Sequence, residues 1–329
     1  MSPVLTYVLL VIVMLIWGLN VVALKLLVEA FAPVTMQAVR IFVAGVSLFI
    51  VLYFLKDLRW LNKKEWGYTL LATVFGVVGH HSFLALGLAQ TSASNAALIL
   101  GMLPLTTSVL AMIFLHDRMT WLRLLGICCG FIGVAFVVLQ NNGGLGTIST
   151  GDLFILLAMA SQAFSFILIK KVTATLSAGE MTAVMLLAGS VMLFAFSLWV
   201  EPHGLDTFSQ GSWWIWLVFF ASAIIATALG HVLFNMGINK IGAGQAAVFN
   251  NLVPFFALVS AFLFLGEPLL LSQIFGFIFI ATGVLLGTGY VDEKLKRANL
   301  MVHSQSKPPV SIHDQIEAQG QHKAKSDSV

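Results

Sequence analysis

The sequence predicts an all-α integral membrane protein in which ten transmembrane helices form two inverted five-helix repeats. Of the 329 residues, 59% are hydrophobic and only 9% are charged, whereas about a quarter of the residues in a soluble domain are charged. Ten apolar stretches are long enough to cross the hydrocarbon core of a bilayer as helices. The chain also matches itself when its numbering is shifted by 150 positions.

The ten stretches follow one another with short polar connections. They cover residues 4–27, 34–55, 66–89, 92–115, 121–140, 152–169, 180–200, 213–238, 243–266 and 269–290. The first has no basic start and no small-residue cleavage site before Trp17, so we expect it to stay in place as the first helix.

The internal match is clearest in the fourth and fifth stretches. At the shift of 150, identical residues pair as His81 with His231, Gly87 with Gly237, Ala93 with Ala243, Ala97 with Ala247, Pro104 with Pro254, Gly126 with Gly276 and Gly133 with Gly283. Many transporters are built from two such repeats. Because each repeat has an odd number of helices, the second must enter the membrane from the opposite side.

Basic residues indicate the orientation, since they favour cytoplasmic loops. With the N-terminus inside, every clear loop cation falls on the cytoplasmic side: Lys56, Arg59, Lys63, Lys64, Arg118, Arg123, Lys170, Lys171 and Lys240. We therefore expect a multi-pass protein of the cell membrane (plasma or inner) with both termini in the cytoplasm. The predicted parts are a first repeat at 4–140, an outer linker at 141–151, a second repeat at 152–290 and a basic, disordered tail at 291–329.

Arg40 is the deepest cation of the sequence. No Asp or Glu lies deep in any predicted span, and ionisable groups within a membrane are costly and usually functional. Arg40 lies about 10 Å into the second helix at 1.5 Å per residue. It could face a water-filled cavity and hold an anionic group of a substrate, or it could snorkel outward and brace neighbouring carbonyls.

His81 and His231 are related by the repeat, and both fall well inside the membrane. Each could bind substrate or exchange protons near neutral pH. A neutral histidine that links two helices is an equally good interpretation.

Other polar and kink-forming residues complete the candidate binding site. Asn250 and Gln245 lie in the ninth helix, where buried amides need partners, and Pro254 and its counterpart Pro104 would free backbone carbonyls and allow kinking or gating. Trp17 and Asn20 lie in the first helix, away from the interfaces where most tryptophans of this chain are expected.

These residues resemble the drug/metabolite transporter superfamily, specifically its ten-helix proteins with two EamA domains. The resemblance rests on Trp17, Gly18, Asn20 and Lys25, on Pro33 and Arg40, on Pro104 and Pro254, and on residues 114–120 and 264–268. Asp117 replaces the usual Glu, and the second copy lacks the Trp-Gly pair. The resemblance implies a carrier that often exports amino acids or other small metabolites through a central cavity.

The predicted function is secondary transport, specifically export of a small polar metabolite by alternating access. A multidrug efflux carrier is the alternative within transport, and a passive channel or sensor is the alternative from another class. An enzyme is not expected, because no Gly-x-Ser-x-Gly elbow or buried carboxylate occurs, and no P-loop indicates ATP use. The expected partners are a small-molecule substrate and the lipid bilayer, with no nucleic acid, metal or cofactor; the sequence leaves a homodimer open.

Overall fold

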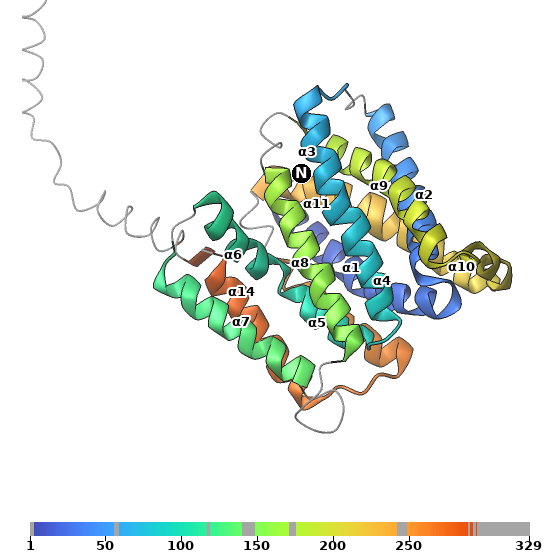
Figure 1. Ribbon diagram of the computed structural model, residues 1–329. Coiled ribbons are helices and arrows are strands. Elements are labelled where there is room, and N and C mark those ends of the chain that lie inside the picture. The colour runs from blue at the N-terminus through green and yellow to red at the C-terminus, as the bar shows by residue number, and fades with distance from the viewer. Residues whose placement is uncertain are drawn as a thin grey trace, which may run out of the picture. The chain divides into compact units, whose positions relative to one another are not determined.

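A computed structural model describes residues 3–55, 59–116, 119–139, 149–170, 176–241, 249–288, 290, 291 and 294 (Figure 1). The chain separates into two compact units, Met1–Tyr290 and Val291–Val329, and the first of these contains the apolar helices. All regular structure in the described ranges is helical, and each of the ten predicted stretches contains a helix.

The helices follow one another along the first unit. They are α1 (Pro3–Ala30), α2 (Pro33–Phe54), α3 (Lys63–Thr73), η1 (Val74–Gly79), α4 (His80–Leu88), α5 (Ala93–Gly101), α6 (Leu103–Leu115), α7 (Trp121–Leu139), α8 (Thr150–Lys170), α9 (Ala178–Val200), η2 (Gly204–Gln210), α10 (Trp213–Phe220), η3 (Ala221–Leu229), α11 (Gly230–Ile241), α13 (Leu252–Ser260), η4 (Ala261–Leu265) and α14 (Leu271–Gly287). Eight helical stretches of the described chain are long and apolar enough to cross a membrane, and two shorter apolar helices, Leu252–Leu265 and Leu271–Gly287, come after them in the chain.

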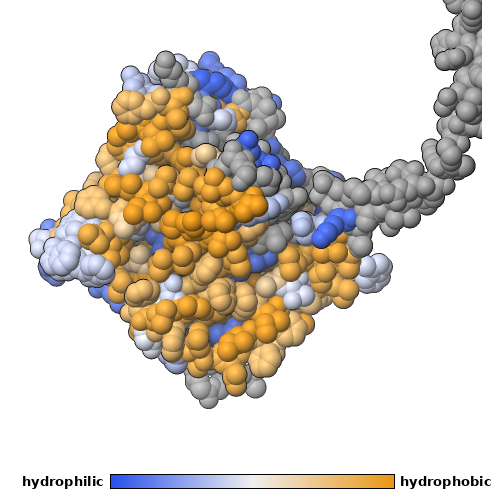
Figure 2. All heavy atoms as spheres, turned by 180° about the vertical axis from the view of Figure 1, so that it is seen from behind, coloured by the Kyte–Doolittle hydropathy of each residue, from blue (hydrophilic) through white to orange (hydrophobic). Residues whose placement is uncertain are grey.

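The outer surface of the helices is strongly apolar. Phe131, Val191, Leu263 and Leu271 are each more than 60% exposed, and Figure 2 shows apolar side chains over much of one face. A water-soluble protein rarely exposes so much contiguous apolar surface. Lipid is therefore the medium that this surface suits.

Glycine lets α7 and α14 pack closely (Figure 1). A methyl group on Gly133 would lie 2.8 Å from the carbonyl oxygen of Gly276, and one on Gly283 would lie 2.7 Å from that of Gly126. Such approach requires residues without a side chain. We call these four glycines the α7–α14 seam. The helices run antiparallel along it, because the lower-numbered glycine of one faces the higher-numbered glycine of the other.

Two carboxylates bind the N-termini of α2 and α5. Glu201 accepts hydrogen bonds from Val34 N at 3.0 Å, Thr35 N at 2.8 Å and Thr35 Oγ1 at 2.7 Å. Glu267 accepts from Ala93 N at 2.7 Å, from Ser94 N at 3.0 Å and from the Ser94 hydroxyl. Free N–H groups and the helix dipole both favour a negative charge there. Each carboxylate thereby ties a helix of the first half of the chain to the second half.

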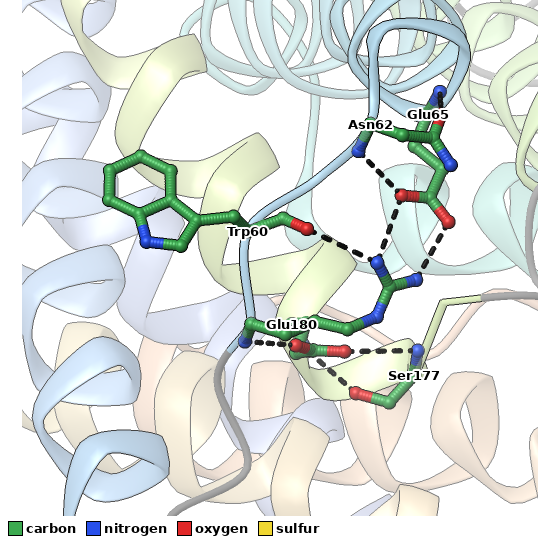
Figure 3. Close-up of polar contacts among 6 residues, drawn as sticks. Trp60, Asn62, Glu65, Ser177 and Glu180 are labelled. Atoms are coloured by element: carbon green, nitrogen blue, oxygen red, sulfur yellow. Dashed lines mark hydrogen bonds and ion pairs between the residues drawn. The ribbon is translucent and has the colours of Figure 1, made fainter.

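The segment that follows α2 is also tied to α9, by the network in Figure 3. Arg59 N donates to Glu180 Oε1 at 2.7 Å, and the Arg59 guanidinium pairs with Glu65 at 2.7 Å. Glu180 also accepts from the backbone N of Ser177, the N-cap residue of α9. α2 is about 33 Å long at 1.5 Å per residue. The contacts of Glu201 and of Arg59 therefore hold α2 beside α9 near both ends of the helix.

Three of the apolar stretches contain π-helical segments, and two of these segments match at the shift of 150. η1 is followed by His80 and His81, and η3 is followed by Gly230 and His231. The same shift relates His116 and Gly266, which both have left-handed backbone angles, with φ of 59° and 66°. π-helical turns often mark functional sites because they leave backbone groups without their regular partners.

Candidate substrate-binding site

Five polar side chains meet at the π-helical segment η3. Asn20 comes from α1, Gln37 and Arg40 come from α2, and Ser222 and Thr227 belong to η3 itself. Gln37 and Arg40 are three residues apart and so lie on one face of their helix. We call these five residues the η3 cluster. It connects the first two helices of the chain to the second half.

Hydrogen bonds link all five members. Arg40 donates from Nε to Gln37 Oε1 at 2.9 Å, and from Nη1 to Thr227 Oγ1 at 2.8 Å and to Ser222 Oγ at 3.3 Å. Ser222 Oγ donates to Asn20 Oδ1 at 2.6 Å, and Thr227 Oγ1 donates to Ser222 O at 2.9 Å. The guanidinium is thus held by neutral oxygens.

Arg40 is only 1% exposed, and no carboxylate in the described part of the chain pairs with it. Burying a charge is costly unless it is paired. In this arrangement the guanidinium bonds to buried side chains, so Arg40 neither snorkels outward nor opens onto water. Arg40 is therefore a buried positive charge whose described partners are all neutral.

Trp17 and His231 are neighbours, and each contacts a backbone carbonyl of η3. Trp17 Nε1 donates to Ala226 O at 3.0 Å, and the Trp17 ring lies 5.5 Å from the His231 ring and 5.0 Å from that of Phe234. His231 Nδ1 is 2.6 Å from Thr227 O, one turn earlier in its own chain segment. A carbonyl can only accept, so Nδ1 carries the proton in this arrangement. The Trp17 side chain therefore joins α1 to η3.

His80 and His81 differ in their surroundings although they are neighbours. His80 Nδ1 donates to Ala158 O of α8 at 3.0 Å, so His80 has the helix-linking role that we considered for His81. The two rings are 4.8 Å apart. His81 Nδ1 is buried without a hydrogen-bond partner among the described residues.

The fourth and ninth predicted stretches meet near Pro254, and no hydrogen bond in the described ranges joins Asn250 to the η3 cluster. Gly101 is the last residue of α5 and lies three positions before Pro104. A methyl group on Gly101 would lie 2.7 Å from Pro254 Cγ. Asn250 Oδ1 is buried without a partner in the described ranges, and no bond links it to the η3 cluster. Gln245 lies outside the described residues.

Sequence reasoning missed Gln37, Ser222 and Thr227. Gln37 stands close to the start of its helix, where a polar residue is unremarkable, but its spacing of three from Arg40 could have identified it. Hydroxyl residues are common in membrane helices and gave no separate signal.

An apolar groove of about 290 Å³ lies between α2 and α9, away from these polar groups. It is lined by Ala38, Val39, Phe42, Ser190, Val191 and Phe194. Phe42 and Val191 are half or more exposed, so the groove belongs to the apolar outer surface.

Comparison with known proteins identifies the family. Residues 4–139 and 149–288 each match the EamA-like transporter family. The uncharacterized transporter YyaM of Bacillus subtilis is 32% identical over 275 residues, covering 81% of this chain and 88% of the relative. The uncharacterized transporter YoaV of the same organism is 24% identical over 280 residues, covering 84% and 94%.

A solved structure described as "Crystal structure of protein" has the same fold. It matches with a TM-score of 0.61 at 15% sequence identity, over 87% of this chain and 97% of that one. Together with the apolar spans, these matches lead to one conclusion: the chain belongs to the EamA-like transporter family and is a multi-pass membrane transporter.

Proposed function

We propose that this protein is a secondary transporter that exports a small polar metabolite with an anionic group, such as an amino acid, by alternating access. The observation that carries the proposal is Arg40, which is buried among neutral partners with no carboxylate of the described chain beside it. A substrate anion would supply the missing charge. On this proposal Trp17, Asn20, His81, His231, Gln245 and Asn250 would also contribute to binding, and Pro104 and Pro254 would act as helix kinks in gating.

Alternating access is proposed because the two halves, 4–140 and 152–290, are expected to be inverted repeats, an arrangement many carriers use. The α7–α14 seam supports this, because the shift of 150 converts its Gly126–Gly283 contact into its Gly133–Gly276 contact. Packing elsewhere agrees: α1 packs on α13 and α11, and the corresponding helix α8 packs on α6 and α4. Such a carrier can rock one half against the other around a central site.

Counterflow in proteoliposomes tests the role of Arg40. Metabolites that accumulate outside cells with and without the protein would first identify the substrate. We expect Arg40→Gln to abolish counterflow of that metabolite, because a charge-assisted bond is lost, and Arg40→Lys to retain only part of it, since the guanidinium geometry is lost. The control is Lys240→Gln, which removes an exposed cation and should leave counterflow unchanged.

The competing functions predict different results in the same assay. If the protein were a multidrug carrier, structurally unrelated cationic dyes would be exported, and Arg40→Gln would not reduce their efflux. If it were a channel, flux would occur without counterflow, and if it were a sensor, there would be no flux. Unaltered counterflow in Arg40→Gln would refute the proposed site while leaving the transport function in place.

A further inference from the structure

We propose that Gln37 is a second ligand of the substrate's anionic group beside Arg40, and that this group is a carboxylate. The identity of the bound group rests on the proposed function. The role of Gln37 rests on hydrogen-bond geometry that can be tested without knowing the substrate.

The orientation of the Gln37 amide is fixed by chemistry. Its oxygen faces Arg40 Nε at 2.9 Å, and an arginine nitrogen can only donate, so the amide cannot be turned round. Gln37 Nε2 therefore presents two N–H groups. It is buried, since Gln37 has no exposed surface, and it has no hydrogen-bond partner within the described ranges. A buried donor left unpartnered is costly and needs an explanation.

An inventory of the η3 cluster shows which kind of group is missing. Each side-chain oxygen already accepts a hydrogen bond: those of Asn20, Gln37, Ser222 and Thr227. By contrast, Gln37 Nε2 is a buried donor without a partner among the described residues, and Arg40 Nη2 and Asn20 Nδ2 have no hydrogen bond to another group of the described chain. The cluster has spare donors and lacks an acceptor. A carboxylate is an acceptor only, with two oxygens to offer, and so matches what is absent.

Charge favours a carboxylate over a phosphate. The η3 cluster contains one cation, Arg40, and one carboxylate would neutralise it. A phosphate monoester carries nearly two negative charges at neutral pH, so it would leave an uncompensated negative charge between the helices. Neutral amide donors such as Gln37 Nε2 then add directional bonds without adding charge.

The first experiment places the missing carboxylate in the chain itself. Gln37→Glu keeps the size of the side chain and puts an acid beside Arg40. We expect the purified protein in detergent to unfold at a higher temperature than the wild type, and the variant to lose transport because its own carboxylate fills the site. The increase should depend on Arg40, so the double variant Gln37→Glu/Arg40→Gln should unfold at a lower temperature than either single variant.

Gln162→Glu is the matched control, because Gln162 is another glutamine of a spanning helix, partly buried in α8, and is not part of the η3 cluster. It should lower the unfolding temperature, since it adds a carboxylate without a cation. If Gln37→Glu lowered the unfolding temperature as much as Gln162→Glu does, the inference that this position lacks an acceptor would be overturned.

The second experiment uses acetate as the probe. Sodium acetate should raise the unfolding temperature of the wild type above the value in sodium chloride of equal concentration, because ligands that bind the folded state stabilise it. In Gln37→Leu the apparent affinity for acetate should fall roughly 10- to 100-fold, as expected for a lost bond to a charged group. Arg40→Gln should abolish the effect.

The outcomes separate this inference from the proposed function. An acetate effect that is equal in Gln37→Leu and wild type, or absent in both, rules out Gln37 as a ligand, even if counterflow still depends on Arg40. A stronger effect of sodium phosphate than of acetate would contradict the carboxylate assignment. If the acetate effect depends on Gln37 while no counterflow is found, the anion site stands and the transport proposal fails.

Discussion

At the scale of single residues, Thr227 shows how closely η3 depends on side chains. Its hydroxyl accepts from Arg40 Nη1 and donates to Ser222 O five residues earlier, which is the spacing of a π-helical turn. One oxygen thus satisfies a buried cation and a backbone carbonyl together. The shape of the segment and the position of Arg40 are therefore coupled through this hydroxyl.

Replacing Thr227 by Val would keep the shape of the side chain and remove the hydroxyl. We expect a loss of about 1–3 kcal/mol in the free energy of unfolding, because an N–H of Arg40 loses its partner while it stays buried. Thermal or denaturant unfolding in detergent would measure this. Thr227→Ser keeps the hydroxyl and is the control. Equal losses in both variants would mean that the methyl group, and not the hydrogen bond, matters.

Sequence reasoning found part of this site for a clear physical reason. Trp17, Asn20, Arg40 and His231 stand out because polar or amphipathic groups are rare in apolar spans, and the structure brings all four to η3. The sequence did not indicate that these residues contact each other, since contacts across some 200 positions leave no local pattern. The role of these residues in binding substrate stays a prediction.

At the scale of elements, the ten apolar stretches could be predicted because length and hydropathy alone decide whether a helix can cross a bilayer. Their internal irregularities could not. η1 and η3 lie within continuous apolar runs, and some of the bonds to their carbonyls come from other helices: Trp17 on Ala226 O, and Ser161 on Phe75 O at 2.8 Å. Tertiary contacts, which are invisible in the local sequence, decide where the helix changes its winding.

The α7–α14 seam gives a test at the same scale. Gly133→Ala should lower the free energy of unfolding by about 1–3 kcal/mol, as overpacking does, because the added methyl group would meet the backbone of α14. Gly67→Ala in α3 is the control. Nothing lies within 4 Å of a methyl group there, so we expect no loss. Equal unfolding temperatures for Gly133→Ala and the wild type would show that α7 and α14 can move apart to accommodate a methyl group without loss of stability.

At the scale of the whole molecule, the inverted arrangement predicts which loops face which side. Gly144 and Leu300 should be on opposite faces of the membrane, since five helices separate the predicted outer linker from the cytoplasmic tail. The assay is labelling of Gly144→Cys and Leu300→Cys by an impermeant thiol reagent in intact cells, after Cys128 and Cys129, which are free thiols, have been replaced by Ala. Only Gly144→Cys should react. Labelling of both would contradict the inverted repeats and the proposed orientation.

The α7–α14 seam has a consequence for the origin of the chain. The shift of 150 converts each of its two contacts, Gly126–Gly283 and Gly133–Gly276, into the other, so the surface is complementary to a rotated copy of itself. On the proposed architecture, a five-helix ancestor could have dimerised through this surface before the gene was duplicated and fused. A polypeptide cut within 141–148 should then still assemble when its two fragments are made in one cell.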